Sequence, residues 1–153
     1  MRRLRGSSTL AIALFTTTLA ACGSSSTTGT TDLDLTGTWT AIKYQFVSVH
    51  HPGTSLDLVT EGYAVTLVGT ATAWTVTVIK NGNTFDTEIG TYTSTASSIT
   101  LTTTNHTNNT STTFIATLGG LDNIITMTGG AGTFDFGTGN GTEAATLNVT
   151  LVR

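Results

Sequence analysis

The side chains that could do chemistry are few and scattered in this 153-residue sequence. His50 and His51 are adjacent, and neighbouring side chains of an extended strand point to opposite faces, so both could bind one ion only at a turn. Pro52-Gly53 could supply that turn, and Asp57 or Glu61 a third ligand. Because this spacing matches no helical or hairpin ligand pattern, we expect a solvated loop here and no metal site.

Acid–base and nucleophilic chemistry has equally little support. Asp86 and Glu88 would share one strand face, and we expect that face to meet water. His106 lies in a polar stretch typical of a loop. The sequence contains no Gly-x-Ser-x-Gly nucleophile elbow, and no phosphate-binding glycine loop opens a helix. We therefore expect no catalytic residue, no cofactor and no enzyme activity.

The first residues form a segment of their own. Arg2, Arg3 and Arg5 precede an apolar run over residues 10–19, which is typical of a secretory signal peptide and too short to span a membrane. The single cysteine, Cys22, follows Leu-Ala-Ala, and this pattern resembles the bacterial lipobox. An ordinary secretory signal with a coincidental cysteine is the alternative.

The lipobox resemblance implies cleavage before Cys22 and acylation of that residue with diacylglycerol and a fatty acid such as palmitate. The lipid bilayer would then be a partner through acylated Cys22. Gly23 stands where many inner-membrane lipoproteins carry an aspartate, which favours the outer membrane of the bacterial cell envelope.

Three regions follow from these patterns: a signal peptide over residues 1–21, the lipidated cysteine with a flexible Gly/Ser/Thr linker over 22–31, and one domain over 32–153. After Cys22 the basic residues are Lys43, Lys80 and Arg153 against nine acids, a formal net charge of −6. Nucleic-acid binding needs clustered basic residues, so we exclude it and expect a monomer that binds no nucleic acid.

The domain reads as all-β because Thr, Val, Ile and aromatic residues dominate it and Gly or Asn interrupts it at short intervals. Trp74, Val76 and Val78 alternate with threonines, as in a strand with one buried face. Asn81-Gly82 predicts a type I′ hairpin. The predicted strands are 35–49, 62–68, 73–80, 84–93, 98–104, 112–118, 123–128, 132–136 and 144–152, with a long loop over 49–61.

Consecutive hairpins leave exposed sheet edges unless the sheet closes on itself or stacks as a sandwich. We expect closure and predict an antiparallel up-and-down β-barrel of eight to nine strands. Leu-Thr-Gly-Thr-Trp ending at Trp39, Gly-Thr-Tyr-Thr from Gly90, and the final strand ending at Arg153 resemble the lipocalin-like domains of small bacterial lipoproteins. The resemblance implies that the Trp39 indole lies across the barrel floor and that Arg153 covers it. Avidin-like barrels begin similarly but carry tryptophans late in the chain, and this sequence has none after Trp74.

An eight-stranded barrel is either filled by side chains or holds one small ligand. The residues predicted to point inward are Trp39, Trp74, Val76, Val78, Phe85, Ile89, Ile99, Leu101, Phe114, Leu118, Ile125, Met127, Phe134, Phe136, Leu147, Val149 and Leu151. Of these, Trp74, Phe85, Phe114, Met127 and Phe134 are the candidates to line an apolar pocket.

We therefore expect a membrane-anchored lipocalin-like lipoprotein that binds a small hydrophobic molecule without catalysis. The alternative is a structural or interaction lipoprotein with a solid barrel core that binds another envelope component. A continuous apolar cavity distinguishes the first from the second.

Overall fold

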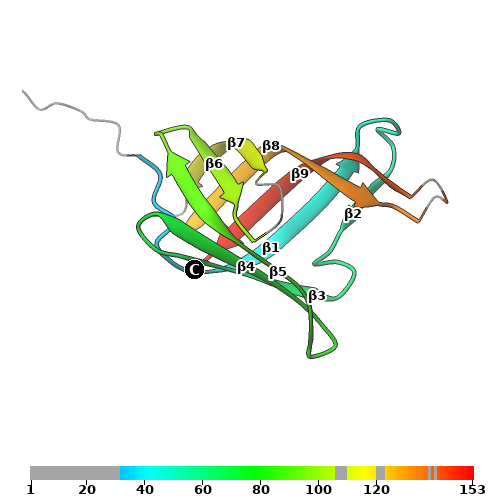
Figure 1. Ribbon diagram of the computed structural model, residues 1–153, viewed down its shortest axis with the longest axis horizontal. Helices are drawn as coiled ribbons and strands as arrows, with labels where there is room; N and C mark the ends of the chain where they lie inside the picture. Colours follow the sequence, from blue (N-terminus) through cyan, green and yellow to red (C-terminus); the bar gives the residue numbers. More distant parts are fainter. Residues whose placement is uncertain (1–31, 106–109, 120–122, 138, 140) are drawn as a thin grey trace, which may run out of the picture.

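The computed structural model describes residues 32–105, 110–119, 123–137, 139 and 141–153, and within them every regular element is a β-strand (Figure 1). The signal peptide, Cys22 and the linker predicted within 1–31 lie outside the described residues, as does His106. Among the described residues, no helix is long and apolar enough to cross a membrane. The strands are β1 Gly37–Ser48, β2 Ser55–Asp57, β3 Tyr63–Gly69, β4 Ala73–Lys80, β5 Asn83–Ser94, β6 Ser98–Thr103, β7 Ser111–Gly119, β8 Ile124–Asp135 and β9 Thr142–Val152.

The strands form one antiparallel sheet in the order β2-β1-β3-β4-β5-β6-β7-β8-β9, and β1 also pairs with β9. This last pairing closes eight strands into a barrel and leaves β2 as an added short strand. The predicted fold class, an antiparallel up-and-down barrel, is confirmed. The described core residues extend from Leu33 to Leu151, inside the domain predicted over 32–153.

The alternation in β4 and the turn that follows it form as predicted. Trp74, Val76 and Val78 are buried, whereas the intervening threonines are partly exposed. The turn to β5 places Asn81 at φ 52° and Gly82 at φ 77°. A type I′ turn requires positive φ at both central positions, and asparagine and glycine tolerate it best.

One prediction of strand boundaries is wrong. The two strands predicted over 123–128 and 132–136 are replaced by one continuous strand, β8 (Ile124–Asp135), and the glycines between them do not form a hairpin turn. The pairing with β9 shifts between Met127 and Gly130, and Gly129 takes φ 79°. This is a β-bulge, which bends a strand and leaves it continuous.

The segment 49–61, predicted as a loop, is held against β1. Its strand β2 pairs with the second half of β1, on the edge where β3 pairs only as far as Thr40. The Asp57 carboxylate accepts hydrogen bonds from the backbone amides of Tyr44 at 3.0 Å and Val59 at 3.1 Å. Leu58 is buried behind this contact. The segment therefore fills the gap that opens between β1 and β3.

A tightly packed floor closes one end of the barrel. Trp39 is fully buried, and its indole N–H donates to the Leu35 carbonyl at 2.8 Å. The Arg153 guanidinium lies 4.5 Å from the centre of the Trp39 ring and donates to the Thr36 carbonyl at 3.2 Å. This is the geometry that the resemblance implies, while the family relationship stays a prediction. Figure 1 shows the C-terminus close to the segment that leads into β1.

The segment before β1 carries a stabilised carboxylate at this end. Asp34 accepts a hydrogen bond from the Thr36 amide at 2.8 Å, and the Tyr92 hydroxyl lies 3.4 Å away. Hydrogen bonds from Thr36 are the main cause of a lowered pKa at Asp34, with smaller contributions from Tyr92 and Arg153. The ionised form of Asp34 therefore favours the folded state.

Candidate functional site

Beyond the floor, the barrel encloses a cavity of about 540 Å³. Its walls are mainly apolar and come from all eight strands of the barrel, with Leu58 before β3 and Thr110 before β7 as the lining residues outside the strands. Pockets for small molecules commonly span roughly 300–1,000 Å³ and combine apolar walls with a few polar groups. The cavity thus has the size and lining of a small-molecule site.

All five residues predicted to line a pocket do line this cavity: Trp74, Phe85, Phe114, Met127 and Phe134. Trp74, Phe114 and Met127 are buried, Phe134 is half-buried, and Phe85 is 65% exposed. The structure therefore brings these side chains together around one space. Their part in binding a ligand stays a prediction.

Three members of the predicted inward set are exposed: Phe85, Ile89 and Leu118. In β5, Glu88 pairs with Val76 and Gly90 with Trp74, so Ile89 points outward. A bulge leaves Phe85 unpaired between Thr84 and Asp86, which places its ring at the barrel edge against Tyr63. Leu118 pairs with the buried Ile125 but lies near the exposed end of β7.

Tyr44 and Phe46 line the cavity although they are outside the predicted inward set. The register of β1 shifts between Ala41 and Lys43, so the inward positions change from odd to even numbers along the strand. Tyr44 packs edge-on against Phe46 at 5.7 Å, and Phe46 stacks on Phe134 at 4.4 Å. The sequence does alternate Tyr44 and Phe46 with polar neighbours, which indicates that both point to the same face. Which face is inward depends on the bulge, and the sequence does not reveal the bulge.

Asp86 and Glu88 also line the cavity, on the inward side of β5; Asp86 is exposed, as expected of a residue that meets water, and Glu88 is half-buried. Their pairing partners Val78 and Val76 are inward-facing, and paired residues of antiparallel strands point to the same side. Burial raises the pKa of the Tyr44 phenol well above 10.0, and the negative charges of Glu88 and Asp86 raise it further. Across the barrel from β5, Tyr44 therefore stays a neutral hydroxyl that can donate a hydrogen bond.

Two glycines make room for the aromatic walls. A Cβ at Gly90 would lie 2.7 Å from Nε1 of Trp74, which donates to the Thr91 carbonyl at 2.9 Å. A Cβ at Gly130 would collide with the ring of Phe114. At Gly90 a Cβ would also collide with the Thr102 carbonyl oxygen, so glycine at both positions permits the close approach of the rings to the strands that line the cavity.

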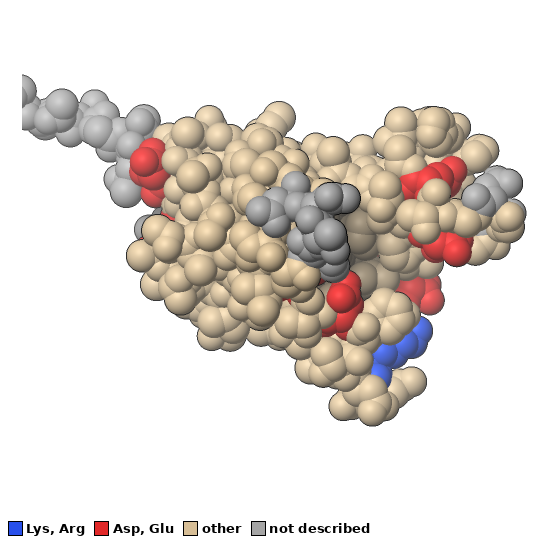
Figure 2. All heavy atoms as spheres, in the orientation of Figure 1, with Lys and Arg blue, Asp and Glu red and all other residues tan. Residues whose placement is uncertain are grey.

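A second hollow of about 380 Å³ adjoins the cavity and shares Leu58, Phe85 and Phe134 with it. Its lining includes the carboxylates of Glu61 and Asp135 and the amine of Lys80. The Lys80 amine lies 4.1 Å from the centre of the Tyr63 ring. Figure 2 shows that this face of the molecule is hollowed right of its centre, with acidic side chains around the hollow and one basic patch below it.

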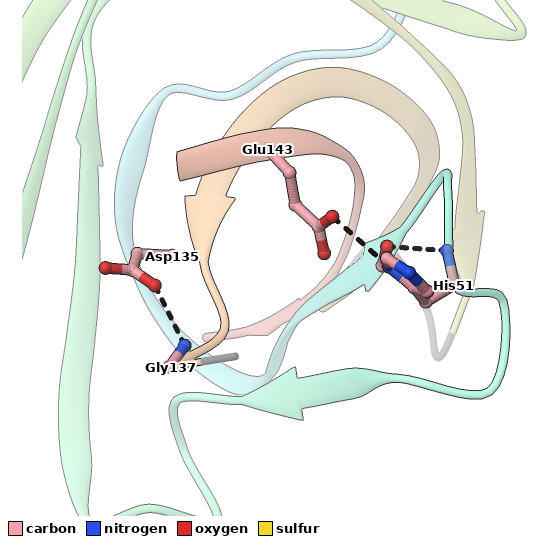
Figure 3. A network of polar contacts seen from close by, with 5 residues as sticks. His51, Asp135, Gly137 and Glu143 are labelled. Atoms are coloured by element: carbon pink, nitrogen blue, oxygen red, sulfur yellow. Dashed lines mark hydrogen bonds and ion pairs between the residues drawn. The ribbon is translucent and has the colours of Figure 1, made fainter. Parts of the chain in front are cut away.

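The candidate histidine ligands do not form a metal site with Asp57 or Glu61. His51 contacts Glu143 instead, with 3.3 Å between Nδ1 and Oε2, and its amide donates to the Ser48 hydroxyl at 2.9 Å (Figure 3). Asp135, drawn in the same view, accepts from the Gly137 amide at 2.9 Å. Within the described parts of the chain, no three His, Cys, Asp or Glu side chains gather closely enough to hold a metal ion.

Glu143 is nine-tenths buried, and its Oε1 atom has no hydrogen-bond partner among the described residues. It pairs with Phe134, a residue of the cavity wall, at the end of the barrel opposite the Trp39 floor. A buried acceptor without a partner is uncommon in a folded protein.

No protein-family model, no curated protein and no solved structure matches this chain.

Proposed function

We propose that this protein is a lipid-anchored, non-catalytic binder of a small hydrophobic molecule in the bacterial cell envelope. The observation that supports this function best is the cavity of about 540 Å³ inside the barrel, lined mainly by aromatic and aliphatic side chains. Transfer of an apolar ligand from water to such walls is favoured by about 25 cal/mol for each Å² of apolar surface removed from water. The alternative, a structural lipoprotein with a solid core, would leave no such space.

The binding part of the proposal is tested by native mass spectrometry of the protein purified from its host envelope. We expect a bound molecule, seen as a mass increment that disappears when the protein unfolds. Val76 lines the cavity, and Val68 is 46% exposed on the outer surface, so Val76→Phe should reduce the increment and Val68→Phe should not. A wild-type protein that carries no increment and takes up no added decanol would contradict the proposal.

The anchoring part depends on Cys22 and is tested separately. Acyl chains contribute about 0.8 kcal/mol for each buried methylene, so a doubly or triply acylated cysteine holds a protein on the membrane firmly. We expect wild type and a Ser24→Ala control to fractionate with membranes, and Cys22→Ser to fractionate with the soluble proteins. Membrane fractionation of the Cys22→Ser variant would contradict lipid anchoring and leave the binding proposal standing.

A further inference from the structure

The cavity has a charge preference as well as an apolar lining. We propose that its ligand is a hydrophobic molecule that carries a positively charged amine, with the amine held between Asp86, Glu88 and the Tyr44 hydroxyl. This inference rests on the proposed binding function and specifies the chemical class of the ligand.

The first observation is the position of the two carboxylates. Asp86 and Glu88 lie on the inward face of β5, beside the apolar side chains of Val78 and Val76. The described residues that line the cavity include no lysine, arginine or histidine. A ligand carboxylate would meet two negative charges there, whereas a ligand ammonium would be attracted by both.

The remainder of the wall also suits a cation. Six aromatic side chains line the cavity: Tyr44, Phe46, Trp74, Phe85, Phe114 and Phe134. Aromatic faces attract ammonium groups by about 0.5–2 kcal/mol, and aromatic walls are a common way to hold alkylated amines. Tyr44 lines the same cavity as Asp86 and Glu88, and a neutral phenol hydroxyl can accept a hydrogen bond from an N–H donor.

An independent observation at the same end of the barrel is Glu143. This side chain is nine-tenths buried, and its Oε1 lacks a hydrogen-bond partner among the described residues. Its neighbours at the inward positions of β9, Ala145 and Val149, are buried, and its pairing partner Phe134 lines the cavity. Glu143 lines neither hollow itself, and it places a third carboxylate behind the wall at this end of the barrel.

The charged side chains outside the cavity also favour a positively charged ligand. The adjoining hollow carries Glu61 and Asp135 against the single amine of Lys80. Clefts lined by one sign of charge concentrate oppositely charged ligands and speed their association. An amine would therefore be enriched at this adjoining hollow, and an anionic amphiphile would be repelled.

Decylamine, decanol and decanoate test the inference because they share one alkyl chain and differ in head-group charge. Their binding to residues 32–153 is measured by calorimetry at neutral pH and low salt, below the concentrations at which they aggregate. We expect decylamine to bind about tenfold more tightly than decanol, a difference of about 1.4 kcal/mol in binding free energy. Decanoate should bind more weakly than decanol, because its carboxylate is repelled by Asp86 and Glu88. The double variant Asp86→Asn with Glu88→Gln should lose the preference for decylamine and still bind decanol.

Asp32→Asn is the matched control, because Asp32 is exposed and lines neither hollow. It should keep the wild-type preference. Equal affinity for the three amphiphiles, or a preference that survives in the double variant, would overturn the inference about the amine and leave hydrophobic binding intact. If none of the three binds the wild-type protein, the inference and the proposed binding function both fail.

Discussion

The two tryptophans provide a matched pair that distinguishes the packed floor from the cavity wall. Trp39 and Trp74 are 0% and 3% exposed. Each donates its indole N–H to a backbone carbonyl, Trp39 to Leu35 at 2.8 Å and Trp74 to Thr91 at 2.9 Å. They differ in what lies beside the ring, since Trp74 borders the cavity and Trp39 is absent from its lining. We expect Trp39→Phe to lower the free energy of unfolding more than Trp74→Phe.

The magnitudes follow from these surroundings. At the floor, Trp39→Phe removes the donor of the buried Leu35 carbonyl, which costs about 1–3 kcal/mol. The space left in the packed floor adds about 1–2 kcal/mol, a part of the roughly 3–5 kcal/mol typical of replacing a buried tryptophan by alanine. At the wall, the hydrogen bond from Trp74 to the Thr91 carbonyl is only partly buried, so Trp74→Phe loses the net value of one hydrogen bond, about 1 kcal/mol.

Urea unfolding of residues 32–153, followed by far-ultraviolet circular dichroism, measures both variants with a signal that does not depend on tryptophan. We expect Trp39→Phe to lower the free energy of unfolding by about 3 kcal/mol and Trp74→Phe by about 1 kcal/mol. Equal losses, or a larger loss at Trp74, would refute the reasoning, because the surroundings of Trp74 would then be as tightly packed as the floor.

Three further predictions concern single contacts. Gly130→Ala should lower the free energy of unfolding by about 1–3 kcal/mol in thermal or urea unfolding, because the added methyl overpacks the wall. Gly119→Ala, which meets no atom within 4 Å, is its control, and equal effects would argue against the close approach of Gly130 to the Phe114 ring. Asp34→Asn should destabilise the protein at neutral pH. Because the folded pKa of Asp34 lies below 3.8, that difference should shrink as the pH falls through the folded pKa, and a difference independent of pH would contradict the assignment. Arg153→Met should cost about 0.5–1 kcal/mol in urea unfolding through the lost cation contact with Trp39, and no measurable loss would remove Arg153 from the floor.

Much of the barrel could be predicted because its signals are local. The alternation of Trp74, Val76 and Val78 fixes which face of β4 is buried, and Asn81-Gly82 fixes the turn after it. Closure was expected because it pairs the two sheet edges that consecutive hairpins would otherwise leave exposed. The strand β2 could not be predicted, because three residues of mixed polarity carry too little periodicity, and its pairing depends on where β3 leaves β1.

The site was harder to predict because bulges change which side chains point inward. A single extra residue reverses the faces of everything beyond it on the same strand. In β1 the bulge after Ala41 turns Tyr44 and Phe46 inward, and in β5 the register turns Asp86 and Glu88 inward. The large apolar residues of the wall could be identified by type alone, whereas its polar groups required the three-dimensional register.

The most direct test of the central claim, that the barrel holds a hydrophobic ligand inside, uses the indole N–H signals of the two tryptophans. Decanol is titrated into ¹⁵N-labelled residues 32–153, and the spectrum reports both rings at once. The structure predicts that the Trp74 signal shifts on binding, because this ring lines the cavity, and that the Trp39 signal stays in place at the packed floor. A spectrum in which neither signal moves at saturating decanol, or in which only the Trp39 signal moves, would contradict the account.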